Sequence, residues 1–487
     1  MLTRQKAFWM VGVFAVAGLT AAFGLRVAEA LPFAASSPLP PPIVRRVTTS
    51  LYLPTVTRYY DPPYVSPFGI VMYENVDDAS GLAAMQAVGS QWVTTVFFWA
   101  ATEPTPPVGG VHTYNWTNWD TRVNNARAAG METYVLFTGN PAWAAYLTGG
   151  PVTDTQSLID VAAAMAERYD GDGLADAPGN PIVNYWSFYP EPDNGGFGAE
   201  GYWGFRGPDY AAMLAQVSSA IHAANPRAKV LIGGVAYDWF NTDQPNPGPF
   251  VSTFLTDTLS VLVGMPGGAP SVIDAMAFHF YPINALRWPT IKEKALEVRT
   301  IMNNHGVGHL PLLVPETGYW SDPVPLYPPF DSDPDQQARR LVQIFVQGLA
   351  VEIDLLSWFA VFDHGTATDA HGLFYNNDLY QPKPAYTAYQ TLTRELDGMY
   401  YSAPVAAGGT EGYLFVRPDG QSRVVVWGTT NPTTTIAFSR TCLRVVDKYG
   451  IVTEIVDGGV GDQDFAINGQ VAVLVYQDQP LYISVCA

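Results

Sequence analysis

The sequence predicts an α/β fold, a (β/α)8 TIM barrel followed by a small antiparallel β-sandwich, from two patterns and one length. Over residues 67–400, short apolar runs alternate with amphipathic helical segments, as in a parallel sheet covered by helices. Eight such units fill about 330 residues, a length that fits a closed barrel. Over residues 401–487 the pattern changes to short strand-like runs separated by turn formers, which is typical of an antiparallel sandwich.

The strands expected in the barrel are near-continuous apolar runs, as in parallel sheets that are buried on both faces. A helix is expected over 210–224, and another begins at Asp333-Pro334, where an N-cap precedes a proline. An open doubly wound sheet is the alternative, but residues 73–76 after the first strand contain no glycine for a phosphate loop. The expected strands are 68–73, 92–98, 132–137, 182–189, 230–235, 273–281, 310–314 and 353–362.

The expected sandwich shows no carboxylate cluster at a strand end, so it is interpreted as structural support for the barrel, with sugar binding as the alternative. It holds the only two cysteines, Cys442 and Cys486. In an oxidising compartment these two form a disulfide; the alternative is two buried thiols. The expected strands are 412–416, 422–427, 433–438, 443–447, 451–456, 471–476 and 481–485.

Residues 1–30 have the pattern of an export signal. Arg4 and Lys6 precede the uncharged run 7–25, and Ala28-Glu29-Ala30 has the small-x-small form that signal peptidase recognises. The run is also long enough to span a bilayer, so the segment is either a cleaved signal peptide or a retained membrane anchor. Both predict a secreted or extracellular, membrane-anchored protein. The proline-rich residues 31–66 are expected to form an extended linker.

The charge and the residue composition exclude several classes of binding partner and cofactor. A net charge of −19 disfavours nucleic acid and anionic lipid, so membrane contact is expected only through an N-terminal anchor. The seven histidines form no tight group with cysteine, which argues against catalytic zinc, and no Gly-x-Ser-x-Gly elbow indicates an esterase. We expect an uncharged substrate and no catalytic cofactor.

Two glutamates follow apolar runs where barrel strands end. Glu191 follows the fourth expected strand and Glu316 the seventh, at the C-terminal rim where barrel active sites form. A carboxylate there has little local reason to be present, because strands disfavour it and burial is costly. Paired carboxylates of this kind perform glycoside hydrolysis. The alternative is that each glutamate is a water-exposed rim residue.

The segments around these glutamates, and most of residues 68–400, resemble the clan A glycoside hydrolases, in particular their β-xylosidase and cellulase branches. Trp186 and Glu191-Pro192 match the family's Trp-x-x-x-Asn-Glu-Pro pattern, and Glu316-Thr317-Gly318 is similar to its strand-seven ending. The resemblance implies a retaining hydrolase of β-linked carbohydrate, with Glu191 as acid/base and Glu316 as nucleophile. His279-Phe280-Tyr281 matches a His-x-Tyr pattern, which implies that Tyr281 hydrogen-bonds the nucleophile.

The same resemblance indicates a set of sugar-binding residues and two departures from the family. Pro190 stands where the family has an asparagine, and 92–103 lacks an arginine often found there. These departures leave open a non-catalytic carbohydrate-binding or adhesion protein on a degenerate barrel. Asp193 either binds sugar or holds its own turn, and Asp363-His364 either lines the cleft or closes a loop. The expected substrate-binding residues are Trp99, Trp143, Trp186, His279, Tyr281 and Trp358.

One loop has the pattern of a metal site. Asp170, Asp172 and Asp176 alternate with glycines just before the fourth expected strand and resemble part of a calcium loop. The full EF-hand pattern is not met, because Leu174 takes a ligand position. A structural calcium ion is therefore one interpretation, and an ordinary acidic turn is the other.

Overall fold

The computed structural model describes residues 50–51, 65–196, 202–237, 249–282, 290–323, 332–363, 370–376, 380–405, 407–430, 433–458 and 469–486. The expected export segment 1–30 and most of the expected linker, 31–49 and 52–64, lie outside the described residues. None of the helices within the described ranges is both long and apolar enough to cross a membrane.

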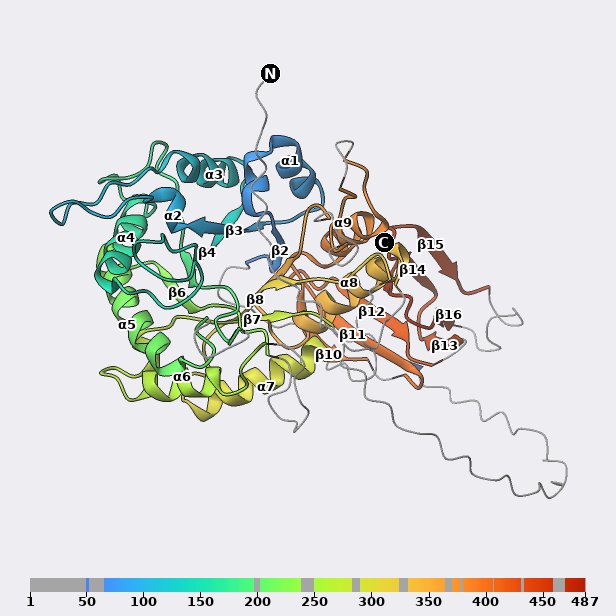
Figure 1. The fold of residues 1–487 in the computed structure, drawn as a ribbon. Helices are drawn as coiled ribbons and strands as arrows, with labels where there is room; N and C mark the ends of the chain where they lie inside the picture. The colour runs from blue at the N-terminus through green and yellow to red at the C-terminus, as the bar shows by residue number, and fades with distance from the viewer. Residues whose placement is uncertain are drawn as a thin grey trace, which may run out of the picture.

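The first part of the described chain is a barrel of eight parallel strands (Figure 1), which confirms the predicted fold class. Each strand overlaps a segment predicted from apolar runs, although most are shorter than predicted. The strands are β2 (Phe68–Val71), β3 (Trp92–Phe98), β4 (Glu132–Thr138), β5 (Tyr185–Phe188), β6 (Lys229–Ile232), β7 (Met276–Phe280), β8 (Leu312–Thr317) and β9 (Leu355–Trp358).

The sheet closes on itself through its two outer strands. Its order is β6-β5-β4-β3-β2-β9-β8-β7, and the parallel bridges Leu231–Ala275 and Val235–Phe278 join the β6 and β7 edges. A closed parallel barrel gathers the carboxyl ends of all its strands at one rim. The loops after β5 and β8, which are not neighbours in the sheet, therefore meet across that rim.

Helices surround the barrel, as the alternating pattern predicts (Figure 1). The helix predicted over 210–224 begins earlier, at Gly207, because Pro208 is accepted in its first turn. The predicted N-cap of α8 is present: the Asp333 side chain accepts a hydrogen bond from the Gln336 amide. The helices are α1 (Ala79–Ala87), α2 (Trp99–Thr102), α3 (Thr117–Ala128), α4 (Thr155–Arg168), α5 (Gly207–Ala224), α6 (Phe254–Val263), α7 (Ile291–Asn304), α8 (Pro334–Leu349) and α9 (Pro384–Leu396), with short 3-10 helices at Tyr73–Asp77 and Ala269–Ser271.

Side-chain alternation along the strands divides the barrel core into two layers. On β4, Tyr134 and Leu136 belong to a cluster inside the barrel, whereas Val135 and Phe137 pack in the layer between strands and helices. On β7, Ala277 lies inside and Phe278 outside. The barrel is therefore filled with side chains, which leaves its rim as the place where a ligand could bind.

The C-terminal part is a sandwich of two sheets, ordered β10-β11-β12-β17-β14-β15 and β1-β13-β16. All seven strands predicted there are present, and two more were missed. The first, β1 (Ser50–Leu51), lies within the expected linker, and the second, β10 (Tyr400–Pro404), pairs with β11 without a clear apolar alternation. The other strands are β11 (Thr410–Val416), β12 (Ser422–Gly428), β13 (Thr433–Phe438), β14 (Cys442–Asp447), β15 (Val452–Val456), β16 (Val471–Tyr476) and β17 (Leu481–Val485).

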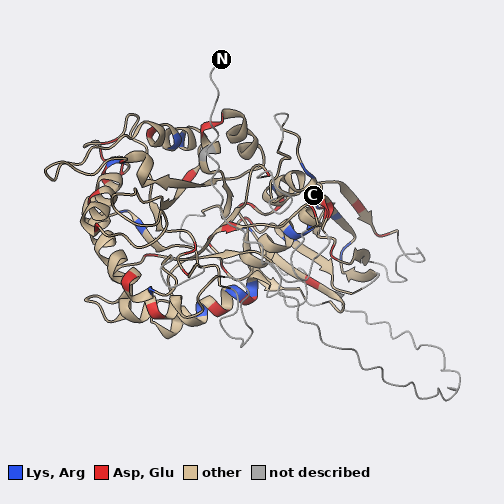
Figure 2. Ribbon diagram, viewed as in Figure 1, with Lys and Arg blue, Asp and Glu red and all other residues tan. Residues whose placement is uncertain are grey.

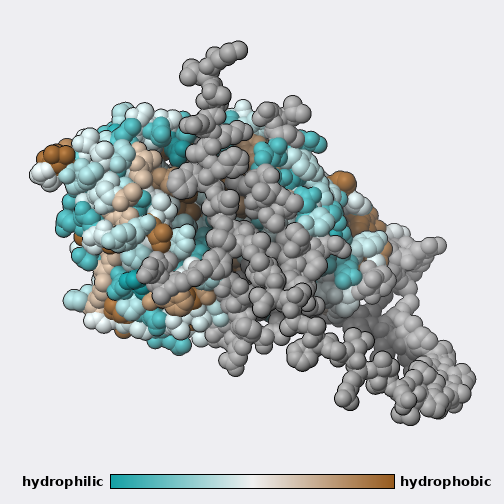
Figure 3. Space-filling model, viewed as in Figure 1, coloured by the Kyte–Doolittle hydropathy of each residue, from teal (hydrophilic) through white to brown (hydrophobic). Residues whose placement is uncertain are grey.

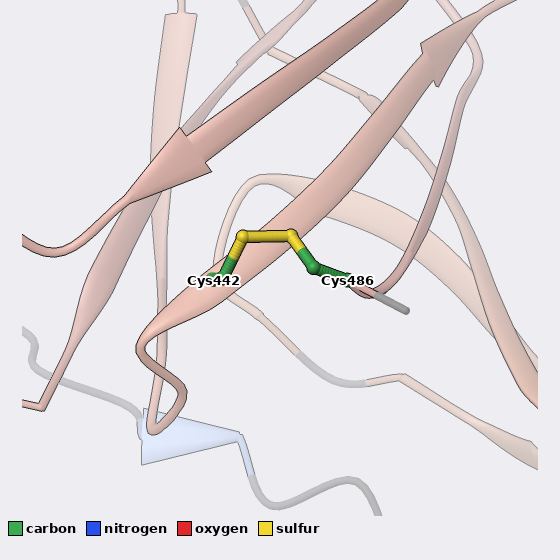
Figure 4. The surroundings of a disulfide bond; sticks show 2 residues. All are labelled: Cys442 and Cys486. Atoms are coloured by element: carbon green, nitrogen blue, oxygen red, sulfur yellow. A yellow bond between two sulfur atoms is a disulfide. The ribbon is translucent and has the colours of Figure 1, made fainter.

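A disulfide fastens the end of the sandwich. Cys442 at the start of β14 is bonded to Cys486 just after β17, with a Cα–Cα distance of 5.5 Å (Figure 4). The predicted pairing of the two cysteines is confirmed. Because the bond links the C-terminal strand to its sheet neighbour, it opposes fraying of the last strand.

A buried carboxylate joins the two domains. Glu395 of α9 is 2% exposed and accepts two hydrogen bonds of 2.9 Å from Arg444 and one of 3.1 Å from Arg423, both on sandwich strands. Burial alone would raise the pKa of Glu395, but these arginines hold it below its ordinary value. Elsewhere acidic and basic residues are spread over both domains (Figure 2), in keeping with a surface that faces water.

Candidate active site

The two predicted glutamates lie at the C-terminal rim of the barrel. Glu316 is part of β8, and Glu191 follows β5 in a sharply turned segment. Tyr189 and Glu191 have φ angles of 60° and 51°, a left-handed conformation that costs energy for side chains larger than glycine and is found at functional sites. The Glu191 amide donates to the Gly234 carbonyl after β6 at 3.1 Å, which holds the turn in place.

Glu191, His279 and Glu316 converge on one point. One carboxylate oxygen from each glutamate and one ring nitrogen of His279 all lie within 4.8 Å of one another. His279 Nδ1 is 3.3 Å from Glu191 Oε1 and 3.9 Å from Glu316 Oε1. The exposed fractions of the side chains are 28% for Glu191, 1% for His279 and 9% for Glu316. Glu191 is thus the carboxylate with more access to solvent.

Two tyrosines orient the Glu316 carboxylate. Tyr281 donates to Oε1 at 2.8 Å, as the family resemblance implies, and Tyr73 donates to Oε2 at 3.2 Å. The sequence analysis did not predict a role for Tyr73, although this residue ends the first expected strand, 68–73, and so lies at the rim. With both oxygens held, the carboxylate has a defined orientation before any substrate binds.

Burial controls the charge in this cluster. Burial raises the pKa of Glu316 above its ordinary value, the nearby charge of Glu191 adds to the rise, and His279 and the two tyrosine hydroxyls partly offset it. Burial likewise lowers the pKa of His279, so its imidazole is neutral at neutral pH. The site therefore contains two carboxyl groups that compete for a proton next to a neutral histidine.

Residues around His279 position its ring. The buried Lys294 of α7 donates to the His279 carbonyl at 2.6 Å and to the Ala236 carbonyl at 3.1 Å, which joins the ends of β6 and β7. Gly234 lies against the imidazole, and a Cβ atom at that position would overlap the ring. Glycine is thus required at position 234 because the His279 ring fills the space of a side chain, and not because the backbone turns there.

Asp193 takes neither of its two predicted roles. Its side chain is 1% exposed and accepts hydrogen bonds from the amides of Ala236 (2.9 Å) and Tyr237 (2.7 Å). Burial raises the pKa of Asp193 to about 7. It therefore ties the loop after β5 to the segment after β6 and is neither exposed to a sugar nor bonded to its own turn.

The prediction of a sugar-binding role is wrong for three of the tryptophans. Trp99, Trp186 and Trp358 are each 0% exposed and belong to the core between strands and helices. Trp99 donates to Glu103 at 2.9 Å and Trp358 donates to the His371 carbonyl at 3.0 Å. Side chains enclosed in this way have no free face on which a sugar could stack.

The neighbour of Trp358 lies beside the site instead. Phe359 is half-buried, and its ring contacts the rings of Tyr73 and Tyr281 with centroid distances of 5.8 and 6.2 Å. Both tyrosines bind Glu316, so Phe359 adjoins the buried carboxylate. Successive side chains on a strand point to opposite faces, so Trp358 lies in the core and Phe359 lies on the side of the two tyrosines.

Two other predicted residues lie near the rim. Trp143, in the loop after β4, is half-buried; its indole donates to the Glu103 carbonyl at 3.2 Å. Asp363 accepts hydrogen bonds from Lys383 at 2.6 Å and from the Gly372 amide at 2.8 Å, which fits the loop-closing alternative. Its neighbour His364 lies outside the described residues.

The acidic loop before β5 does bring its carboxylates together. Oxygens of Asp170, Asp172 and Asp176 lie within 4.8 Å of one another, a separation that would suit a hard cation. The same carboxylates accept backbone amides: Asp172 binds the Leu174 amide at 2.8 Å, and Asp176 binds the Gly173 amide at 2.6 Å. Calcium binding and an ordinary turn both fit this arrangement, so calcium stays a prediction.

Comparison with known proteins identifies the fold. No family model matches it, and no curated protein matches its sequence. Among solved structures, a family 39 glycoside hydrolase from Bacteroides cellulosilyticus WH2 has a TM-score of 0.63 at 17% identity, over 86% of this chain and 81% of that one.

Two further solved structures show the same architecture. A family 39 β-xylosidase from Caulobacter crescentus has a TM-score of 0.59 at 14% identity, over 88% of this chain and 98% of that one. An α-L-arabinofuranosidase from Thermotoga maritima has a TM-score of 0.56 at 12% identity, over 86% and 97% respectively. The chain therefore has the barrel-and-sandwich fold of the clan A glycoside hydrolases.

Proposed function

We propose that the protein is a retaining glycoside hydrolase that cleaves β-linked oligo- or polysaccharides. The observation that carries this proposal is the approach of carboxylate oxygens of Glu191 and Glu316 to within 4.8 Å. Retaining enzymes hold their two carboxyl groups about 5 to 5.5 Å apart, whereas inverting enzymes leave about 6.5 to 9.5 Å for a water molecule. A close, intact pair also argues against the non-catalytic alternative suggested by Pro190.

The proposed roles of the two glutamates are those that the family resemblance implies, and their surroundings support them. Glu316, held by Tyr73 and Tyr281, forms a bond to the anomeric carbon while the glycosidic C–O bond breaks. Glu191, the more exposed of the two, donates its proton to the departing oxygen. It then accepts a proton from water, whose oxygen attacks the anomeric carbon and releases Glu316. His279 is neutral and close to both carboxyl groups, and its hydrogen bond to Glu191 helps to hold the Glu191 proton in place.

A screen of substrates tests this function directly. Purified protein should hydrolyse at least one member of a panel of nitrophenyl β-glycosides, with β-xyloside and β-glucoside tested first. Those two sugars are chosen because similar structures include a β-xylosidase and a glucosidase. Nuclear magnetic resonance of the first product formed should show the β-anomer, since two displacements retain configuration. An α-anomer as first product would contradict the double-displacement mechanism.

The proposal includes an extracellular location. The disulfide between Cys442 and Cys486 is typical of oxidising compartments, and the N-terminal segment 1–30 has the pattern of an export signal. A secreted or membrane-anchored enzyme would meet polymeric carbohydrate outside the cell. N-terminal sequencing of the natural protein would separate a cleaved signal from an anchor.

The pH profile should respond to the tyrosines around Glu316. In Tyr281→Phe, a hydrogen bond that lowers the pKa of Glu316 is lost, so this pKa rises further. Glu316 attacks only as a carboxylate, so the acidic limb of kcat/KM should move to higher pH, and the plateau should fall about tenfold. Tyr389→Phe is the control, because its buried hydroxyl binds the Gly69 carbonyl away from the site. An acidic limb that stays in place in Tyr281→Phe would contradict the assignment of that limb to Glu316.

A structural calcium ion in the acidic loop makes a separate prediction. If Asp170, Asp172 and Asp176 bind calcium, a chelator should lower the melting temperature by about a few degrees, because an ion that binds only the folded state stabilises it. Asp172→Asn keeps an oxygen for the Leu174 amide but removes a charge, so it should abolish the response to calcium. Identical melting curves of the unaltered protein with calcium and with chelator would establish the loop as an ordinary turn.

A further inference from the structure

Exposed aromatic side chains are concentrated on two loops beside the candidate active site. Among the described residues, the exposed large aromatic side chains are Tyr146 (93%), Phe205 (66%), Tyr476 (51%) and Tyr202 (39%). Tyr146 lies in the loop between β4 and α4, and Tyr202 and Phe205 lie in the loop between β5 and α5. Both loops leave the carboxyl ends of neighbouring barrel strands, and the second loop also carries Glu191.

The two loops contact each other through one of these rings. The Tyr202 ring lies over Gly149 of the β4–α4 loop, where a Cβ atom would be only 3.1 Å from the tyrosine Cε1. The Phe205 ring lies over Gly195 in the same way, at 2.6 Å from a Cβ atom built there. Because both glycines present bare backbone, the rings rest directly on the loops and leave their other surfaces to solvent.

The half-buried Trp143 connects this region to the barrel. It lies on the same loop as Tyr146, and its ring packs edge-on against Trp99 with a centroid distance of 5.4 Å. Trp99 in turn hydrogen-bonds the buried Glu103. The base of the β4–α4 loop is therefore held by buried contacts, while Tyr146 at its outer part is almost fully exposed.

Exposed aromatic rings at a catalytic rim fit a carbohydrate chain. The C–H face of a sugar packs on an aromatic ring while its hydroxyl groups remain hydrated, and an aromatic ring binds with little loss of conformational entropy. Large continuous apolar patches mark many protein-binding surfaces, and on the face in Figure 3 the described hydrophobic residues form small separate groups among hydrophilic ones. A net charge of −19 disfavours an anionic membrane.

We propose that Tyr146, Tyr202 and Phe205 form an aromatic platform that binds sugar units beyond the one at the two glutamates, and that the substrate is consequently a polysaccharide chain. This inference rests on the proposed function and extends it from the bond cleaved to the length of the substrate. Tyr202 and Phe205 lie on the loop that carries Glu191, and Tyr202 contacts the loop that carries Tyr146, so the three rings share the barrel rim with the two glutamates.

The test compares a polymer with a short substrate. Tyr146→Ala, Tyr202→Ala and Phe205→Ala should each lower the ratio of kcat/KM on xylan to kcat/KM on nitrophenyl β-xyloside about tenfold, as expected for the loss of one stacking contact. Tyr146→Phe and Tyr202→Phe keep the ring and should keep the ratio. Tyr476→Ala removes an exposed ring from the sandwich, away from the two loops, and should keep the ratio too. Equal losses on both substrates would overturn the platform, because they would indicate a distorted Glu191 loop.

A binding experiment separates failure of the platform from failure of the proposed function. Glu316→Gln protein should migrate more slowly in a native gel that contains xylan, and Tyr146→Ala in that background should restore normal migration. Slower migration of a wild-type protein that hydrolyses no substrate would support the platform and contradict the hydrolase. Hydrolysis of the aryl xyloside without hydrolysis or binding of xylan would support the hydrolase and overturn the platform.

Discussion

Glu316→Gln should lower kcat by about a thousandfold or more on every substrate, because no other group can form the covalent bond to the anomeric carbon. Glu191→Gln should lower kcat by a similar factor on substrates with an alkyl leaving group. On a nitrophenyl glycoside its first step should be nearly normal, since nitrophenolate leaves without protonation. Glu352→Gln, an exposed glutamate at the opposite end of the barrel, is the matched control.

Rescue by azide distinguishes the roles of the two glutamates. In Glu316→Gly, azide should enter the space left by the nucleophile and displace the leaving group once, which gives an α-glycosyl azide from a β-glycoside. In Glu191→Ala, azide should instead attack the glycosyl-enzyme, which gives a β-glycosyl azide after two displacements. If the anomers of the two azides are exchanged, the assignment of nucleophile and acid/base must be exchanged as well.

Gly234→Ala should cost about a hundredfold in kcat/KM, although residue 234 carries no reacting group. The added Cβ overlaps the His279 ring, and a displacement of about 1 Å in a catalytic constellation costs about that factor. The Gly234 carbonyl also accepts the Glu191 amide, so the turn that carries the acid/base should shift too. Steady-state kinetics measure the loss, and Gly81→Ala in α1, where a Cβ makes only ordinary contacts, is the control.

A double-mutant cycle checks the reason for this loss. In a His279→Ala background the space beside residue 234 is free, so Gly234→Ala should cost clearly less there than in the unaltered protein. Thermal melting of each variant shows that the protein is folded. Additive losses would mean that Gly234 acts through the backbone of the Glu191 turn and not through the imidazole.

Several parts of the fold were predictable because they depend on a few consecutive residues. Apolar runs long enough for a strand predicted all eight barrel strands, and Asp333-Pro334 predicted the start of α8. Turn formers between short runs predicted seven strands of the sandwich. The missed strand β1 has its partner β13 nearly 400 residues further along the chain, at Ala437 and Phe438, so no local pattern indicates it.

The sequence by itself determined the chemistry that is available at the rim: a glutamate after each of two apolar strands, and a His-x-Tyr pair on a third. These residues could be predicted from local pattern, because the end of an apolar run marks the carboxyl end of a barrel strand and therefore the rim. Only the tertiary structure decided which groups touch. Tyr73 binds Glu316 across 243 residues, and that contact exists only because the barrel closes.

Tertiary structure also decided which aromatic side chains are buried and which are exposed. Trp358 is the more conspicuous residue in the sequence, yet it points into the core, and Phe359 lies beside the tyrosines of the site. Tyr146 and Tyr202 belong to no sequence motif, and only the folded structure shows that both are exposed and that Tyr202 rests on Gly149 of the other loop. Local sequence specifies strands, caps and candidate acids. The direction of each side chain depends on packing between segments far apart in the chain, because burial is a property of the whole fold.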